Sequence, residues 1–215
     1  MKNAIVFSVG LLLAASTVVA DEPQFSWSRT TLALIASGDP ARGQEIAEKH
    51  RCKKCHGDAG VSEDADIPSI AGQVAAYQFK QLVDYKSGAR TERSMNKIAR
   101  KLTPEDMADL SAHYAAQAPA KVPQRSMPTL VSSGDMTRFL LPCQVCHGKQ
   151  GEGFGFEVPA LAGQSHEYLL ETLGEFREGE RSNDHYGRMR YVAKQLTPDE
   201  VNELAAYYAA VQSAE

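Results

Sequence analysis

Two copies of one short motif constrain this chain more than any other feature. Residues 52–56 spell C-K-K-C-H and residues 143–147 spell C-Q-V-C-H, and together they contain all 4 cysteines of the 215 residues. This spacing is typical of covalent c-type haem attachment, because two thiols one helical turn apart can each add to a haem vinyl group. The sequence therefore predicts two haem c groups, each held by two thioether bonds and an iron-bound histidine, from Cys52, Cys55 and His56 and from Cys143, Cys146 and His147.

The two motifs belong to a longer internal repeat. Residues 68–73, P-S-I-A-G-Q, match residues 159–164, P-A-L-A-G-Q, at the same distance from each motif. Further along, the Gly-x-Arg segments and the methionine-bearing segments also match, but the second copy has a short insertion between them. A repeat of this length indicates two similar domains in tandem.

The N-terminus is typical of an export signal. Lys2 precedes a largely apolar run, and Val18-Val19-Ala20 fits a small-residue cleavage site. We expect a signal peptide at 1–20, a first domain at 21–118, a proline-containing linker at 119–128 and a second domain at 129–215. An uncleaved anchor is the alternative to cleavage, but no later segment is apolar for long enough to span a bilayer. We therefore predict a periplasmic protein without a membrane span after cleavage.

The local patterns of both copies are helical. Apolar residues recur at helical spacing over 73–86 and 164–178, and a glycine follows each segment, as at a helix C-cap. An Asp-Pro pair at 39–40 and Thr-Pro pairs at 103–104 and 197–198 predict helix starts. Because no convincing alternating strand pattern appears, we expect an all-α fold.

The charge of the chain limits its partners. The formal net charge is -4 at pH 7, which argues against nucleic acid as a partner. Arg51, Lys53 and Lys54 surround the first haem motif, whereas four glutamates follow one another over 171–180 in the second domain. We hypothesise that the two haem edges face different partners, one donor and one acceptor. Ordinary solvated helix surface is the alternative interpretation of these charges.

The order of the motifs resembles that of a known family. C-x-x-C-H, P-x-I/L-A-G-Q, Gly-x-Arg, M-x-x-I/V-A-x-x-L and a tyrosine-bearing final helix resemble class I cytochrome c, and their duplication resembles the dihaem cytochromes c4. The resemblance implies two tandem all-α cytochrome c domains, each with one covalently bound haem c, and electron transfer without substrate chemistry. It also implies redox partners among membrane respiratory complexes, such as a terminal oxidase, and allows a loose association with the membrane.

The resemblance implies a sixth iron ligand for each haem. Met95 and Met189 match the family's distal methionine, and a thioether opposite imidazole favours the reduced iron and raises the potential. Core filling is the alternative role for any methionine. His185 lies in the insertion of the second copy, so bis-histidine ligation of that haem is the alternative there.

The same mapping implies two pairs of supporting residues. The carbonyl groups of Pro68 and Pro159 would accept a hydrogen bond from the ring of the proximal histidine, where turn formation is the alternative role. Arg90 and Arg181 would bind haem propionates, because a planar guanidinium suits a carboxylate. Solvated arginines at helix ends are the alternative here.

Three functional classes remain open on the sequence alone. The first is a dihaem electron carrier between respiratory donors and a terminal oxidase or other acceptor. The second is the cytochrome subunit of a dehydrogenase, such as a flavocytochrome sulfide or thiosulfate dehydrogenase. A haem enzyme with an open iron position is the third, and the matched Met95 and Met189 argue against it. A zinc site built from the four cysteines leaves the paired histidines unexplained.

Overall fold

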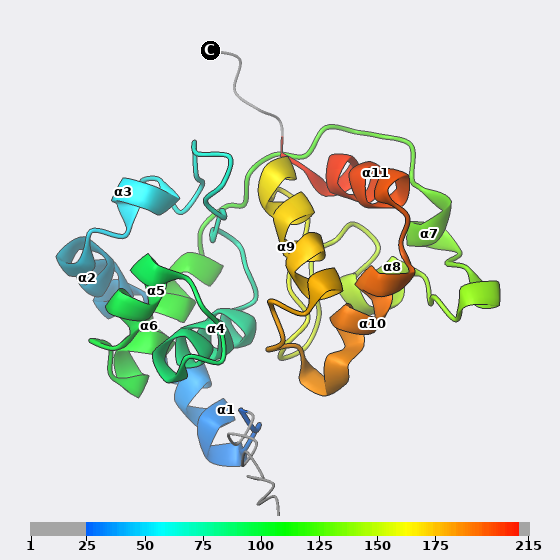
Figure 1. Cartoon of the computed structure of the whole chain (residues 1–215). Helices are drawn as coiled ribbons and strands as arrows, with labels where there is room; N and C mark the ends of the chain where they lie inside the picture. The colour runs from blue at the N-terminus through cyan, green and yellow to red at the C-terminus, as the bar shows by residue number, and fades with distance from the viewer. Residues whose placement is uncertain (1–24, 211–215) are drawn as a thin grey trace, which may run out of the picture.

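The computed structural model describes residues 25–210, which form two groups of helices joined by a long connection (Figure 1). Within these residues the backbone forms helices, turns and isolated bridges but no named β-strand, which confirms the all-α prediction. The predicted signal peptide at 1–20 and its cleavage point lie outside the described residues.

The helices of the two groups follow the internal repeat of the sequence. The first group consists of α1 (Arg29–Ala36), α2 (Pro40–His50), α3 (Lys53–His56), α4 (Ala75–Ser87), α5 (Arg93–Ala99) and α6 (Pro104–Ala115). The second group consists of α7 (Thr129–Ser132), η1 (Met136–Arg138), α8 (Cys143–His147), α9 (His166–Glu178), η2 (His185–Gly187), α10 (Arg188–Gln195) and α11 (Pro198–Tyr208). Each C-x-x-C-H motif thus ends in a short helix, α3 or α8.

The predicted helix ends are present. The Asp39 side chain accepts a hydrogen bond from the backbone N–H of Ala41 at 2.8 Å, at the start of α2. Thr103 and Thr197 each form a capping box at the start of α6 and α11, which satisfies backbone donors that a helix leaves free. Gly88 and Gly179 end α4 and α9 at φ of 89° and 83°, a region that favours glycine.

Each group of helices has its own hydrophobic core. The first core contains Ala47, Phe79, Leu102, Met107, Ala108, Leu110 and Tyr114. The second core contains Leu130, Val131, Leu140, Leu169, Leu196, Leu204, Ala205 and Tyr208. Separate contiguous cores are typical of separate domains, so we call the two groups the first and second domain.

The connection between the domains runs past two matching glycine loops. It leaves the end of α6, passes the start of α9 and reaches α7 (Figure 1). A Cβ atom at Gly72 would lie 2.9 Å from the Pro119 ring, and one at Gly163 would lie 2.6 Å from the carbonyl oxygen of Ala120. Glycine is therefore needed at both positions for the connection to approach so closely.

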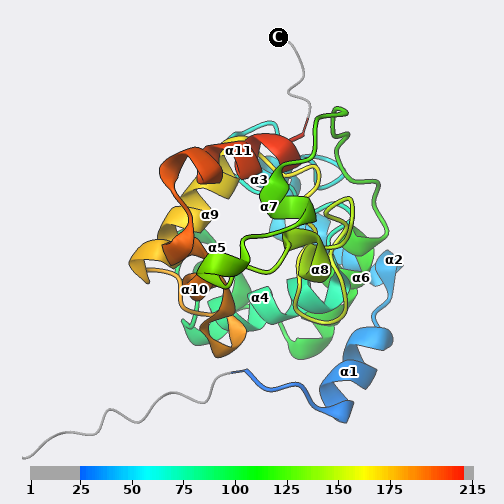
Figure 2. The same ribbon diagram turned by 90° about the vertical axis from the view of Figure 1, so that its right-hand side faces the viewer.

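The segment before α2 contacts both domains. Helix α1 packs on α4 and α6 and lies at the edge of the molecule in both ribbon views (Figure 1, Figure 2). Upstream of it, the Trp27 ring lies 5.7 Å from that of Phe156, and its Nε1 donates to Glu157 at 3.4 Å. Among residues 25–210 no helix is long and apolar enough for a membrane span.

Candidate haem sites and the cluster between the domains

The first C-x-x-C-H motif presents two free thiols beside a buried histidine. Cys52 is half-buried, Cys55 is exposed, and both are free of disulfide bonds. The His56 ring donates from Nδ1 to the carbonyl oxygen of Pro68 at 2.8 Å. Burial lowers the pKa of His56, which favours the neutral ring. With Nδ1 donating, the neutral ring presents Nε2 as the atom able to bind a metal.

The second motif repeats this arrangement in the second domain. Cys143 is half-buried and Cys146 is exposed, again as free thiols. The His147 ring donates from Nδ1 to the carbonyl oxygen of Pro159 at 2.9 Å, and burial lowers its pKa. Burial also raises the pKa of the Cys143 thiol to about 11. Both histidines are therefore held in the tautomer that suits an iron ligand.

Backbone hydrogen bonds position the loops that carry the two prolines. In the first domain the N–H groups of Ile70 and Ala71 donate to the carbonyl oxygen of Gly60, at 2.7 and 2.9 Å. Gly72 N–H donates to the carbonyl oxygen of Tyr114, on α6. Equivalent bonds link residues 161 and 162 to Gly151, and residue 163 to Tyr208, in the second domain. The proline carbonyl is thus aimed at the histidine by contacts internal to each domain.

The two predicted distal methionines lie at equivalent places in the fold. Met95 is in the first turn of α5 and Met189 is in the first turn of α10, and both are half-buried. His185, the alternative ligand, is in η2. Its Nδ1 lies 3.8 Å from a carboxylate oxygen of Glu157, is buried, and has no hydrogen-bond partner among the described residues.

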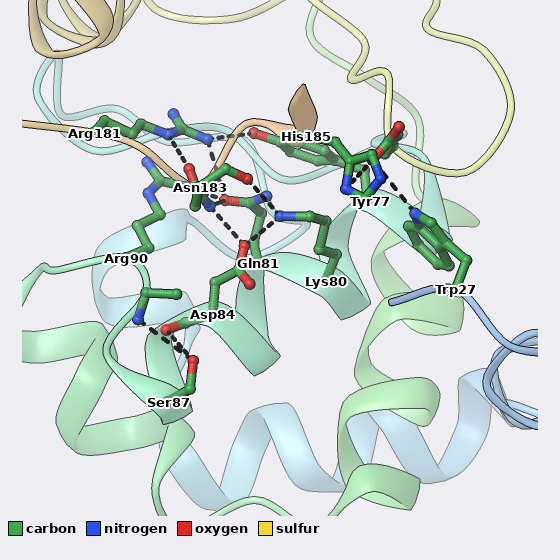
Figure 3. Close-up of polar contacts among 12 residues, drawn as sticks. Trp27, Tyr77, Lys80, Gln81, Asp84, Ser87, Arg90, Arg181, Asn183 and His185 are labelled. Carbon is green, nitrogen blue, oxygen red and sulfur yellow. Dashed lines mark hydrogen bonds and ion pairs between the residues drawn. The ribbon is translucent and has the colours of Figure 1, made fainter. Parts of the chain in front are cut away.

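Arg90 and Arg181 each reach across to the other domain. Arg90 Nη2 donates to the Tyr168 hydroxyl at 2.9 Å, and Arg181 Nη2 donates to the Tyr77 hydroxyl at 2.9 Å. Figure 3 shows both arginines over α4, pointing toward one set of polar side chains. The sequence predicts propionate-binding roles for both arginines, but it does not indicate that each one contacts a tyrosine of the other domain.

The arginines belong to a larger polar cluster between the domains. We define the interdomain cluster as Tyr77, Lys80, Gln81, Asp84 and Arg90 of the first domain with Tyr168, Arg181 and Asn183 of the second. Gln81 Oε1 accepts from Arg90, Arg181 and Asn183 at 2.9, 3.1 and 3.0 Å. The cluster therefore links side chains from both domains through a single amide oxygen.

Asn183 comes from the insertion in the second copy. Its side chain donates to Asp84 at 2.7 Å, and its backbone carbonyl accepts from Lys80 at 2.7 Å (Figure 3). Lys80 also pairs with Asp84 at 2.6 Å, and both side chains are almost completely buried. The insertion stands out in the sequence, but Asn183, Lys80, Gln81 and Asp84 do not, because nothing local to these residues distinguishes them from surface positions.

The charges of the interdomain cluster fit haem propionates. Asp84 pairs with Lys80, whereas the hydrogen-bond partners of Arg90 and Arg181 named above are neutral hydroxyl and amide groups. Burial acts to raise the pKa of Tyr168, but Arg90 and Arg181 outweigh it and lower that pKa to about 8. Arg181 is buried and Arg90 is half-buried, and the Glu175 carboxylate lies near enough to both for its charge to interact with theirs. Cations in such places need anionic partners, and haem propionates would supply further ones. Together with the free thiols and the histidines, the residues present fit two haem c groups.

The arrangement does not suit a four-cysteine zinc site. Within residues 25–210 no group of three or more His, Cys, Asp or Glu side chains is placed to hold a metal ion. The cysteines of the two motifs belong to separate domains.

Comparison with known proteins identifies the family. The model of the cytochrome c family matches residues 40–115 and 138–212. A thiosulfate dehydrogenase electron acceptor of Stutzerimonas stutzeri is 37% identical over 74% of this chain and 78% of that protein. A cytochrome c4 of Pseudomonas aeruginosa is 33% identical over 80% of this chain and 88% of that protein.

A solved structure agrees with both sequence comparisons. The crystal structure of reduced cytochrome c4 from Pseudomonas stutzeri matches with a TM-score of 0.72 and 29% identity, over 81% of this chain and all of that one. The chain therefore belongs to the cytochrome c family, as a two-domain protein of the cytochrome c4 kind that transfers electrons through two covalently bound haem c groups and is not itself an enzyme.

Proposed function

We propose that this protein works in the periplasm and carries electrons from a respiratory donor to a terminal oxidase or another acceptor, through two His/Met-ligated haems. The export signal expected at 1–20 supports the compartment. The reciprocal contacts between Arg90 and Tyr168 and between Arg181 and Tyr77 carry the proposal. They join the two domains through the arginines that we propose as propionate ligands, which suits a unit of two coupled redox centres.

Each site residue has a defined role in this proposal. Haem c supplies a reversible one-electron iron centre when bound. The two macrocycles would be held by two pairs of cysteines, Cys52 with Cys55 and Cys143 with Cys146. His56 and His147 would bind the irons through Nε2, while the carbonyl groups of Pro68 and Pro159 orient their rings. Met95 and Met189 would supply the other protein ligand of each iron, and Arg90 and Arg181 would bind the propionates.

The assignment of Met95 and Met189 as iron ligands is tested by removing one of these methionines at a time. In Met95→Ala and Met189→Ala, we expect CO to bind one haem of the reduced holoprotein, because each variant loses one thioether ligand. The reduction potential of that haem should also fall. Met107→Leu is the matched control, since Met107 is a core residue that is 1% exposed. Reduced holoprotein that binds no CO after Met95→Ala or Met189→Ala would refute the assignment of that methionine.

The alternative ligand of the second haem needs its own variant. His185→Ala in the presence of Met189 should leave the spectrum of the second haem unchanged. If His185 is the ligand, this variant will bind CO and Met189→Ala will not.

A second candidate function is that of an electron acceptor bound to a dehydrogenase. The relative from Stutzerimonas stutzeri named above favours it, since its name makes it an acceptor for thiosulfate dehydrogenase. Co-purification of the tagged holoprotein from its native host in mild detergent separates the two. A stoichiometric dehydrogenase would make this protein its dedicated acceptor. Recovery alone, or with a loosely bound terminal oxidase, would support the mobile carrier.

A further inference from the structure

We propose that Gln73 and Gln164 each tune the haem of the opposite domain, by hydrogen bonding to the peptide group that holds its proximal histidine. Gln164 Oε1 accepts from the backbone N–H of Ser69 at 2.8 Å, and its Nε2 donates to the Ser69 carbonyl oxygen at 2.9 Å. Gln73 makes the same pair of bonds to Ala160 of the second domain, at 2.8 and 2.9 Å. The two glutamines thus form a reciprocal clamp between the domains.

The clamp acts on the peptide unit that the histidine uses. The carbonyl oxygen of Pro68 and the N–H of Ser69 belong to one planar peptide group. His56 Nδ1 donates to that carbonyl at 2.8 Å, while the N–H at the other end donates to Gln164. A continuous hydrogen-bond chain therefore runs from the ring of His56, through one peptide, to a side chain of the second domain.

The second haem site has the same chain in the opposite direction. His147 Nδ1 donates to the Pro159 carbonyl oxygen at 2.9 Å, and the N–H of Ala160 in that peptide donates to Gln73. The crossing is complete, because each domain supplies the glutamine that serves the histidine of the other. This role is separate from the interdomain cluster, whose contacts come from other residues.

The glutamines are rigidly placed for this role. Gln73 is 8% exposed and Gln164 is 7% exposed. Each Oε1 also accepts from the next backbone N–H, that of Val74 at 2.9 Å and that of Ser165 at 3.0 Å. Turning either amide over would set its N–H₂ group against two backbone donors, so the hydrogen-bond pattern itself fixes the orientation.

Polarisation along the chain gives the effect its sign. Hydrogen bonds in a chain strengthen one another in a low-dielectric interior. The glutamine carbonyl therefore makes the Pro68 or Pro159 oxygen a better acceptor, which strengthens the bond from the histidine and raises the basicity of the ring toward the iron. A more basic ligand favours the oxidised iron, so loss of the glutamine should raise the reduction potential of the opposite haem.

The test is to measure both potentials after changing one glutamine. In Gln164→Met holoprotein, we expect the equilibrium of the first-domain haem to shift three- to tenfold toward the reduced form. That shift is about 30–60 mV at ~59 mV per tenfold for one electron. The potential of the second-domain haem should hardly change. Gln73→Met should give the mirror result, and NMR-monitored redox titration resolves the two haems in each variant.

A second substitution of Gln164 separates polarisation of the hydrogen-bond chain from loosening of the contact between the domains. Gln164→Glu keeps an acceptor for the Ser69 N–H, and once ionised the carboxylate is a stronger acceptor. We expect the first-domain potential to fall in this variant as the carboxylate ionises, opposite to the change in Gln164→Met. If the substitutions acted only by loosening the interface, the potential would change in the same direction in both variants.

A matched control removes another contact between the domains. The Ser165 hydroxyl donates to the carbonyl oxygen of Ala65, which is not part of the peptide that His56 uses. Ser165→Ala should leave both potentials unchanged. Three results would overturn the proposal: equal shifts in the potentials of both haems, a shift confined to the haem of the substituted domain, or no shift in either Gln164→Met or Gln73→Met.

The inference rests on His56 and His147 as iron ligands in the proposed function, but the two can fail separately. The CO assay on the wild type and on Met95→Ala and Met189→Ala tests the methionine ligands of the proposed function, and co-purification tests the carrier role. Neither result depends on Gln73 or Gln164.

Discussion

The two domains share the geometry of the candidate haem site but differ in the helices that precede the C-x-x-C-H motif. In the first domain the full-length helix α2 packs on α6, and Arg42 pairs with Asp109 at 2.8 Å. At the equivalent place the second domain has only the short α7 and η1, and Arg138 pairs there with Glu200 at 2.6 Å. The comparison teaches that the motif, the proline loop and the methionine-bearing helix keep the same arrangement in both domains, whereas the helix that packs beside them varies.

The surfaces around the two motifs also differ. Lys53 and Lys54 are exposed beside Cys55, whereas the second motif has Gln144 and an exposed Val145 in their place. In the described part of the two domains, all exposed large hydrophobic side chains belong to the second: Met136, Phe139, Leu141, Val145, Phe154, Phe156, Tyr186 and Tyr191. A charged surface beside the first motif and exposed apolar side chains on the second domain would suit different partners, as the sequence hypothesis of a separate donor and acceptor requires.

The largest effect should come from the element that only the second domain possesses. We expect Asn183→Ala to lower the free energy of unfolding of the holoprotein by about 2 kcal/mol, because buried hydrogen bonds to Asp84 and Gln81 are lost. Denaturant unfolding measures the change. Ser182→Ala, at an exposed neighbour, is the control. A loss no larger than that of the control would show that the insertion is not needed to join the domains.

A smaller effect on stability should follow from breaking the Arg138–Glu200 pair of the second domain. Arg138 lowers the pKa of Glu200 to about 2, from an ordinary value of 4.5. Because the folded-state pKa is the lower one, this contribution is complete above about pH 4.5 and is lost as pH falls toward 2. We expect Arg138→Gln to lower the thermal midpoint of the second domain by a few degrees at pH 7 and by less at pH 3.

Thermal unfolding followed separately for each domain at the two pH values checks this prediction. The matched variant is Arg42→Gln, since Arg42 lowers the pKa of Asp109 in the first domain. Its effect should be confined to α2 and α6. If Arg138→Gln destabilises the second domain equally at both pH values, the Glu200 pair is not the source of the acid sensitivity.

The smallest effect on the protein itself should come from the charged face. Lys53 is 67% exposed in a pair with Asp58, so Lys53→Glu with Lys54→Glu should leave stability almost unchanged. The association rate with a partner that docks at the first domain should change severalfold at low salt and converge with wild type at high salt. Stopped-flow oxidation measures it, and Val145→Glu serves as the control on the second domain. Unchanged kinetics at every salt concentration would remove the docking role of these lysines.

Features that depend on neighbouring residues were predictable from the sequence. The capped starts at Asp39, Thr103 and Thr197 and the glycine ends of α4 and α9 appear where expected. These signals work locally because a cap or a left-handed glycine acts within a few residues. The domain limits at 118 and 129 and the haem ligands stay predictions.

The short helices that precede the second motif were not predicted. The repeat suggested two similar domains, but the segment before Cys143 forms α7 and η1 rather than a counterpart of α2. Pro142 and Gly134 interrupt it, and the backbone at Gly134 has φ of 68°, which a continuing helix cannot adopt.

The sequence by itself determined the two haem motifs, the helices that carry them and the proline loops behind each histidine, since all of these arise from short spacings along the chain. Only the tertiary structure decided that Arg90 and Arg181 exchange tyrosines, that Asn183 enters the interdomain cluster, and that Gln73 and Gln164 cross to the opposite proline loops. Each of these contacts joins residues about a domain's length apart. Such contacts depend on how two finished domains pack together, and local residue patterns do not record that packing.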